Sequence, residues 1–326
     1  MITQARLAIR LQRFEVIAVV VVAAVVGLSA LIVRWRLDVV GVPSLCWDQW
    51  FGNMGATNAD CTVVVEAFLR TNEEEAGKIM AAMAIVPLFA GVFLGVPIVA
   101  REIEGRTAPT VWALAASRPR WLVGRLIPML VVLILALGFA ALASEVLWLG
   151  REPWGVVPRF GDVGLHGPGV VARAIATFGL SLLAGAFIGR VLPAVIVGVM
   201  LCLVLLLGWG LAVTAWGNAV AEVRDMPADQ SFEAAFPGGT AMSTGWITPD
   251  GRFLYDHEAV ELAPPGVDPF EWLYGVASAE GYRQVARGIP GTAYPTWSAI
   301  ETIGFGGIGL IAIALAFPVT DRRRPT

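Results

Sequence analysis

The amino-acid sequence predicts an all-α polytopic membrane protein with six transmembrane helices, both termini in the cytoplasm and a mixed extracytoplasmic loop before the last helix. Composition is the first reason: 57% of the 326 residues are hydrophobic and 15% are charged, whereas a soluble domain carries about 25% charged residues. The mean hydropathy is +0.71. The other two reasons are six long apolar runs and the placement of the arginines around them. The spare apolar surface is expected to face lipid.

Each apolar run is long enough to cross about 30 Å of hydrocarbon, which takes about 20 residues in a helix. A signal peptide is the alternative for the first run, but Arg34 and Arg36 stand where a cleavage site needs small residues. We therefore expect a retained helix. The six expected spans are 14–33, 80–100, 121–149, 170–189, 192–216 and 297–319.

Arginine placement gives these spans a direction, because positive charges near span ends resist translocation. With the N-terminus inside, 12 of the 23 basic residues lie in or beside short cytoplasmic segments, whereas the other 11 lie mainly in longer, acid-rich outer segments. Four tryptophans at span ends would then form an outer aromatic belt: Trp35, Trp148, Trp216 and Trp297. The expected cytoplasmic pieces are 1–13, 101–120 and 320–326, and the outer ones are 34–79, 150–169 and 217–296.

Two of these pieces have a pattern of their own. Residues 1–13 carry a stripe of arginines beside an apolar stripe, which is typical of a cytoplasmic interfacial helix; an ordinary basic tail is the alternative. The loop 217–296 contains two strand-like runs around Asp250-Gly251 and a helix-like run over 268–287. It is too small for a typical independent domain.

The three cysteines fit the expected topology. Cys46 and Cys61 lie in the first outer loop, where an oxidising compartment permits a disulfide. Two unpaired thiols are the alternative. Cys202 falls in the middle of the fifth span, where packing is its simplest role.

Several functions are excluded by what the chain lacks. Its one lysine, Lys78, does not stand in the G-x-x-x-x-G-K-[ST] pattern that cradles nucleotide phosphates. Two histidines, His166 and His257, cannot make a His-rich metal site, and no Ser/His/Asp set appears. We therefore expect no catalytic residue, no metal or cofactor bound by this chain, and no nucleic-acid partner.

The connection between the second and third spans is the most informative stretch. Gly105 is expected to break the helix, Thr107 to cap a short new one with Pro109 in its first turn, and Pro119 to stop it. A short helix held at the membrane surface is suited to docking a cytoplasmic partner. A charged turn that only fixes topology is the alternative.

This connection resembles the cytoplasmic loop of type-2 ABC exporter permeases, in the style of those from actinobacteria. Residues 97–107 read P-I-V-A-R-E-I-E-G-R-T and residues 117–121 read S-R-P-R-W, similar to P-L-V-A-R-E-x-E-x-G-T followed by S-R-x-R-W. The order Gly105-Arg106-Thr107 departs from the pattern, in which Gly directly precedes Thr. The motif covers roughly 25 residues, and the layout of spans and loops is similar over most of the chain.

The resemblance implies the permease subunit of an ATP-driven exporter in a bacterial plasma membrane. Two permease copies, identical or different, would form the translocation path, and two copies of a separate ATPase would bind ATP and Mg and dock on this loop. Few fixed charges in the spans favour a hydrophobic or amphipathic cargo, such as a drug, antibiotic, peptide or lipid. The residues that would couple to the ATPase are Arg101, Glu102, Glu104, Arg106, Thr107, Trp112, Arg118 and Arg120.

Three charges lie near the outer ends of spans three, four and six: Glu145, Arg173 and Glu301. They could pair with one another, line the exit of a translocation path, or simply reach the interface. Glycine pairs such as Gly91-x-x-x-Gly95 and Gly185-x-x-x-Gly189 allow close helix approach.

Two other classes compete with the permease. A stand-alone secondary transporter or channel would need buried charges at mid-membrane or an internal repeat, and neither is visible. A membrane-embedded enzyme would need a catalytic set, but the run 73–75 of glutamates lacks histidine partners.

Overall fold

The computed structural model describes residues 2–47, 59–115, 117–151, 162–226, 235–236, 239–268, 272–276 and 280–323. The chain divides into two compact units. The first comprises residues 1–155, 162–207 and 298–326, and the second comprises residues 156–161 and 208–297.

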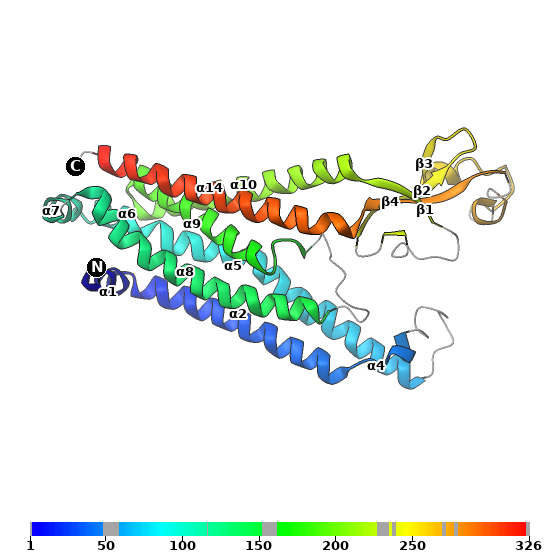
Figure 1. Cartoon of the computed structure of the whole chain (residues 1–326), viewed down its shortest axis with the longest axis horizontal. Coiled ribbons are helices and arrows are strands. Elements are labelled where there is room, and N and C mark those ends of the chain that lie inside the picture. The colour runs from blue at the N-terminus through cyan, green and yellow to red at the C-terminus, as the bar shows by residue number, and fades with distance from the viewer. Residues whose placement is uncertain are drawn as a thin grey trace. The chain divides into compact units, whose positions relative to one another are not determined.

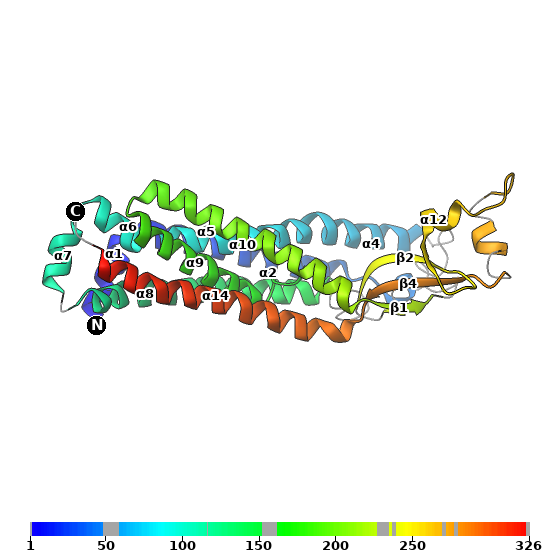
Figure 2. The ribbon, with the colours of Figure 1, turned by 90° about the horizontal axis from the view of Figure 1, so that it is seen from above.

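The first unit is a bundle of helices (Figures 1 and 2). Among the described residues, six helical segments are long and apolar enough to cross a membrane. The predicted helical membrane fold with six spans is therefore confirmed, whereas its orientation stays a prediction. Both ends of the chain lie at the same end of this bundle, beside α1, α6 and α7. The helices are α1 (Ile2–Leu11), α2 (Arg13–Val40), α4 (Ala59–Arg70), the π-helical η1 (Thr71–Ala76), α5 (Gly77–Gly95), α6 (Pro97–Glu104), α7 (Ala108–Leu114), α8 (Arg118–Leu149), α9 (Pro168–Ile188), α10 (Val191–Val220) and α14 (Tyr294–Arg322); α10 and α14 extend into the second unit.

The second membrane-crossing segment is much longer than its apolar run. A continuous helical stretch of 45 residues, Asp60–Glu104, contains α4, η1, α5 and α6. Residues 59–79, expected as part of an outer loop, are therefore helical. At about 1.5 Å per residue the stretch is about 67 Å long, more than twice the thickness of the hydrocarbon. Its polar N-terminal part escaped detection because a search for apolar runs does not register a helix that continues beyond lipid.

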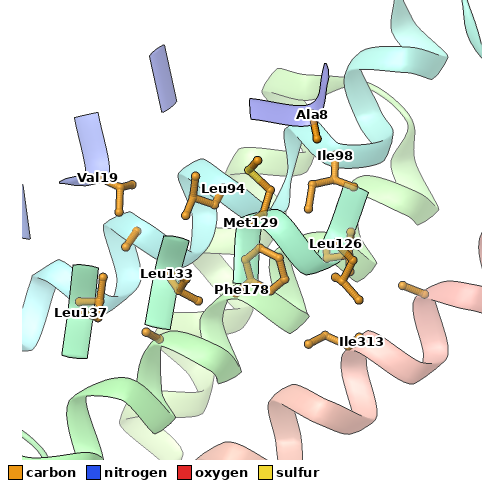
Figure 3. Packing of buried hydrophobic residues seen from close by; sticks show 14 of the residues in the cluster. Ala8, Val19, Leu94, Ile98, Leu126, Met129, Leu133, Leu137, Phe178 and Ile313 are labelled. Carbon is orange, nitrogen blue, oxygen red and sulfur yellow. The ribbon is translucent and has the colours of Figure 1, made fainter. Parts of the chain in front are cut away.

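The core of the first unit forms where α2, α5, α6, α8, α9 and α14 meet (Figure 3). Leu126, Met129, Leu133 and Leu137 recur at three- and four-residue intervals on α8, so they form one buried face. Phe178 of α9 is fully buried in the same cluster.

Glycines let the helix backbones touch. A Cβ at Gly95 of α5 would lie 2.6 Å from the carbonyl oxygen of Phe178, and one at Gly185 of α9 would lie 2.6 Å from that of Val96. Each position therefore excludes a side chain. Gly91, Gly95 and Gly185 thus pack α5 and α6 against α9 within one chain, whereas Gly189 has φ +71° and ends α9 beside the Arg323 side chain.

At the other end of the first unit, Cys46 and Cys61 are joined in a disulfide with their Cα atoms 5.2 Å apart. Both lie in a buried apolar cluster with Trp47 and Phe68. Cys202 is a buried free thiol.

We expect the bridge to form in the mature protein and to stabilise this end of the bundle. Closing a separation of 15 residues stabilises a fold by about 3 kcal/mol in the chain-entropy model, so Cys46→Ser should lower the free energy of unfolding by about 2–4 kcal/mol. Intact mass after denaturation and alkylation should show one alkylated cysteine without reductant and three with it. Three alkylated cysteines without reductant would contradict the bridge.

Two expected belt tryptophans prove to be buried. Trp148 is 6% exposed and stacks on His166 with ring centroids 4.2 Å apart, and Trp297 is 3% exposed and stacks on Trp216 at 4.5 Å. Only Trp35, at 64% exposed, presents an open indole of the kind that a belt requires. Aromatic rings near span ends are thus used largely for packing.

The second unit contains a four-stranded antiparallel sheet in the order β1-β4-β2-β3. Its strands are β1 (Glu222–Asp225), β2 (Thr240–Ile247), β3 (Phe253–Tyr255) and β4 (Arg283–Ile289), and the short helix α12 (Asp256–Val260) follows β3. The hairpin expected around Asp250-Gly251 is confirmed, with Trp246 opposite Leu254. Gly251 has φ +86°. A hydrogen bond from the Thr248 side chain lowers the pKa of the exposed Asp250 carboxyl, and a hydrogen bond from a backbone N–H lowers it further.

The helix expected over 268–287 is wrong at its C-terminal end. Residues 283–289 form β4, which pairs with both β1 and β2. The strands that pair with β4 on its two sides come from residues 222–225 and 240–247, so its local sequence does not register them. Residues 272–276 form a π-helical turn, and residues 269–271 and 277–279 lie outside the described part of the chain.

Candidate functional site

The candidate site is the connection α6–α7–α8, at the end of the first unit that also carries α1 and the C-terminal end of α14 (Figure 1). Pro109 lies in the first turn of α7, as expected. Thr107 precedes α7, but its side chain makes no capping hydrogen bond, because its hydroxyl donates to Glu102 instead. Pro119 does not stop α7, which ends at Leu114; it lies in the first turn of α8, where the Ser117 side chain accepts a hydrogen bond from the Arg120 N–H. The result is a separate seven-residue helix between two spans.

The turn between α6 and α7 closes on an unusual residue. The N–H of Arg106 bonds to the carbonyl of Ile103 and that of Thr107 to Glu102, each at 3.1 Å, which is the Schellman arrangement. This motif places one residue in the left-handed region, and here it is Arg106, with φ +55°. Gly105 keeps an ordinary φ of −73°. The left-handed position is therefore the one directly before Thr107, where the resembling loops carry glycine.

Arg106→Gly should stabilise this turn. A non-glycine residue in the left-handed region costs about 1 kcal/mol or more, so the variant is expected to raise the free energy of unfolding by about 1 kcal/mol and to slow amide exchange at residues 106 and 107. Arg106→Ala removes the same side chain but keeps the strain, and should give no gain. Equal stabilisation by both variants would show that the side chain, and not the backbone, is responsible.

Glu102 fastens the connection to α8. Its carboxylate accepts a hydrogen bond at 2.9 Å from Arg125, with side-chain exposures of 15% and 13%. The hydroxyl of Thr107 donates to the same carboxylate. Because both charges are largely removed from water, the partners depend strongly on each other.

Arg101 and Glu104 fasten it to other helices. Arg101 donates to the carbonyl of Leu11, at the end of α1, at 2.9 Å. It also donates to the carboxylate of Glu15, in the first turn of α2. Glu104 accepts from the N–H of Val191 at 2.9 Å, so it caps the start of α10. These charges, expected at a partner interface, are thus engaged within the chain.

Trp112 and Arg118 form the inner side of α7. Trp112 is 7% exposed, its ring meets that of Trp121 edge-on at 6.1 Å, and the Arg118 guanidinium lies 4.7 Å from its centroid. Arg118 also donates to the carbonyls of Asp321 at 2.6 Å and Arg323 at 2.8 Å. The C-terminal end of α14 is therefore held at this site.

The outer side of α7 remains exposed. Pro109, Thr110, Ala113 and Leu114 are all exposed, and Leu114 has 84% of its surface open. Arg106 and Arg120 are exposed on either side. Of the eight residues implied by the resemblance, these two arginines have no side-chain hydrogen bond or ion pair within the described part of the chain, whereas the others mostly hold the helix in place.

The three charges near the opposite span ends are engaged in two separate pairs. Arg173 donates hydrogen bonds to Glu301 at 2.8 Å and to the carbonyl of Val163 at 3.1 Å. The side chain of Glu301 is 2% exposed. Glu145 bonds instead to His166 Nδ1, at 2.6 Å. Mutual pairing among the three charges therefore occurs only between Arg173 and Glu301, because Glu145 pairs with His166 instead.

Two contributors were missed from sequence. One is His166, because nothing in the local sequence indicates its pairing with Glu145. Arg323 donates to the carbonyls of Phe187 at 2.9 Å and Ile188 at 3.0 Å, and so satisfies the C-terminal end of α9. The basic tail gave a signal, but it was interpreted as topology only.

Comparison with known families identifies one match. Residues 16–214 match the family model described as ABC-2 membrane transporter related, more than half of the chain and including every part of the α6–α7–α8 connection. No curated protein and no solved structure matches the chain. With its six apolar helices, the chain is a multi-pass membrane protein that belongs to the ABC-2 membrane transporter related family, a family of ABC transport permeases.

Proposed function

We propose that the chain is the membrane-spanning subunit of an ATP-driven exporter, and that separate ATPase subunits dock on the exposed side of α7. The observation that carries the docking site is that exposed side, with Leu114 84% open on a helix whose inner side is held by Trp112 and Arg118. A fixed helix with an open apolar side is suited to binding a partner and passing on its displacement.

Further parts of the proposal follow from this arrangement. Two permease copies, identical or different, enclose the path, and two partner ATPase copies hold ATP and Mg. Hydrophobic or amphipathic cargo is favoured, because Arg173 and Glu301 neutralise each other and leave few free charges in the spans.

The proposed membrane is a bacterial plasma membrane, with both termini cytoplasmic. The arginine asymmetry of the sequence supports this orientation. So does the position of the Cys46–Cys61 bridge, at the end of the first unit away from α7 (Figure 1), because disulfides persist in oxidising compartments.

A photocrosslinking amino acid at position 114 tests the docking site. In native membranes we expect it to join the chain to a polypeptide that carries a P-loop. The same label at position 45 should not; this exposed leucine is next to Cys46, whose disulfide partner lies in α4. Reconstituted vesicles holding both subunits should then accumulate a hydrophobic dye only with ATP. ATP-independent transport by the purified chain would overturn the proposal in favour of a secondary transporter.

A further inference from the structure

A cavity of about 350 Å³ opens between α1, α7 and the first two turns of α8. Its walls include Leu7 of α1, Val111 and Leu114 of α7, and Trp121 of α8. This volume lies within the range of small-molecule sites but holds only part of a lipid. The walls suit an apolar chain.

The lining of the cavity includes two cationic side chains, Arg120 and Arg125. Arg125 is paired with Glu102, whereas no acidic side chain pairs with the exposed Arg120 among the residues that the structure describes. The cavity therefore combines an apolar wall with one uncompensated positive charge.

The same wall contains an unpartnered donor. Trp121 is 8% exposed, and its buried indole N–H has no hydrogen-bond acceptor within the described part of the chain. Buried donors are normally paired, because an unpaired donor has lost its hydrogen bonds to water without a replacement. Since this nitrogen is itself closed off, the case for a ligand rests on the apolar lining and on Arg120.

We propose that this cavity binds an anionic phospholipid, with its phosphate at Arg120 and the start of an acyl chain along Leu7 and Val111. Three features favour a lipid over a soluble anion. The cavity is largely apolar, it is bounded by a helix with the composition of an interfacial one, and it lies at the ends of membrane-crossing helices. Anionic lipid attracts arginines near a membrane surface.

The site is tested with the purified full-length chain after delipidation. Native mass spectrometry with added phosphatidylglycerol should show a retained lipid, whereas phosphatidylcholine with the same acyl chains should be retained at least about fivefold less. That ratio corresponds to about 1 kcal/mol for one arginine near anionic lipid. Equal retention of the two lipids would overturn the charge recognition.

Three variants separate this cavity from general surface charge. Arg120→Gln should weaken phosphatidylglycerol retention about fivefold, and Gly124→Leu, which fills the cavity from α8, should weaken it at least as much. Leu7→Trp fills the cavity from α1 and serves if Gly124→Leu is not monodisperse. Arg10→Gln, on the exposed surface of α1 outside the cavity, should have no effect.

Two results would reject the lipid. Unchanged retention in Arg120→Gln and in both filling variants would place the bound lipid elsewhere and leave the cavity to another occupant, such as a side chain of the partner ATPase. Thermal stabilisation by inorganic phosphate equal to that by phosphatidylglycerol would identify a free-anion site. The assay contains no ATPase, so its outcome is independent of the proposed exporter function.

Discussion

Replacing Leu114 by glutamate is expected to abolish recovery of the partner ATPase while the permease still inserts and folds. Leu114 is the most open large apolar side chain of α7, with 84% of its surface exposed, so its substitution removes little from the core. An interface anchor of this kind contributes about 2 kcal/mol or more, and a buried carboxylate adds a desolvation cost. Affinity for the ATPase should therefore fall at least about thirtyfold, measured on the purified permease in nanodiscs.

Two variants make this experiment specific. Leu45→Glu places the same charge on another exposed leucine, at 64% exposure, and should leave ATPase affinity unchanged. Ala113→Arg alters the same open side of α7 without lining the lipid cavity, and should reproduce the loss. Reversal of Glu102 and Glu104 would be less informative, because both carboxylates hold the loop from within. Normal affinity in Leu114→Glu would exclude this side of α7 as the docking surface.

Removing one partner of the Arg173–Glu301 pair should destabilise the fold severely. Glu301 is 2% exposed at its side chain, and a buried charge that loses its partner costs about 3–5 kcal/mol. Arg173→Met should therefore lower the free energy of unfolding by this amount, measured by denaturant titration in detergent. The double variant Arg173→Met/Glu301→Met should recover most of the loss, because two apolar side chains leave no charge behind.

Transport by the double variant then assigns the role of the pair. Normal transport would show that the two charges only hold α9 against α14. Lost transport in a stable double variant would show that they act on the translocation path. Glu145→Gln supplies a control, because its partner is His166 and not Arg173. A double variant as unstable as the single one would contradict the expected compensation.

The features that could be predicted from sequence have local causes. Long apolar runs specify membrane-crossing helices, and Pro109 and Pro119 each favour the start of a helix, α7 and α8. The hairpin around Gly251 follows from a turn that needs positive φ. In each case the relevant energy is determined within a few residues.

The features that escaped prediction depend on contacts between distant residues. Glu102 and Arg125 meet only because α6 and α8 are neighbours. Pairing between Arg173 and Glu301 was one of the alternatives from sequence, but nothing in the sequence selected this pair over pairs with Glu145. The position of each charge within its span indicates its depth in the membrane, but the sequence does not show which helices are neighbours in the bundle. Glu145 could therefore not be matched to His166. Likewise β4 forms because two strands are already present to pair with it.

Arg106 shows that a turn can keep its conformation although its glycine stands one position earlier in the sequence. The departure at Gly105-Arg106-Thr107 suggested a changed loop, yet the turn forms with Arg106 in the position that needs positive φ. Two main-chain hydrogen bonds, each 3.1 Å long, hold it there. The strained residue is kept because the cap satisfies carbonyls that would otherwise be left open at the end of α6.

The fastening of the α6–α7–α8 connection has a mechanical consequence. Arg101 ties it to Glu15 at the start of α2, Glu104 to the start of α10, and Arg118 to the end of α14. A load applied to the open side of α7 is therefore shared among several membrane-crossing helices at once. Local bending would first have to break charged contacts. The connection should therefore move as a rigid body and shift the ends of these helices together.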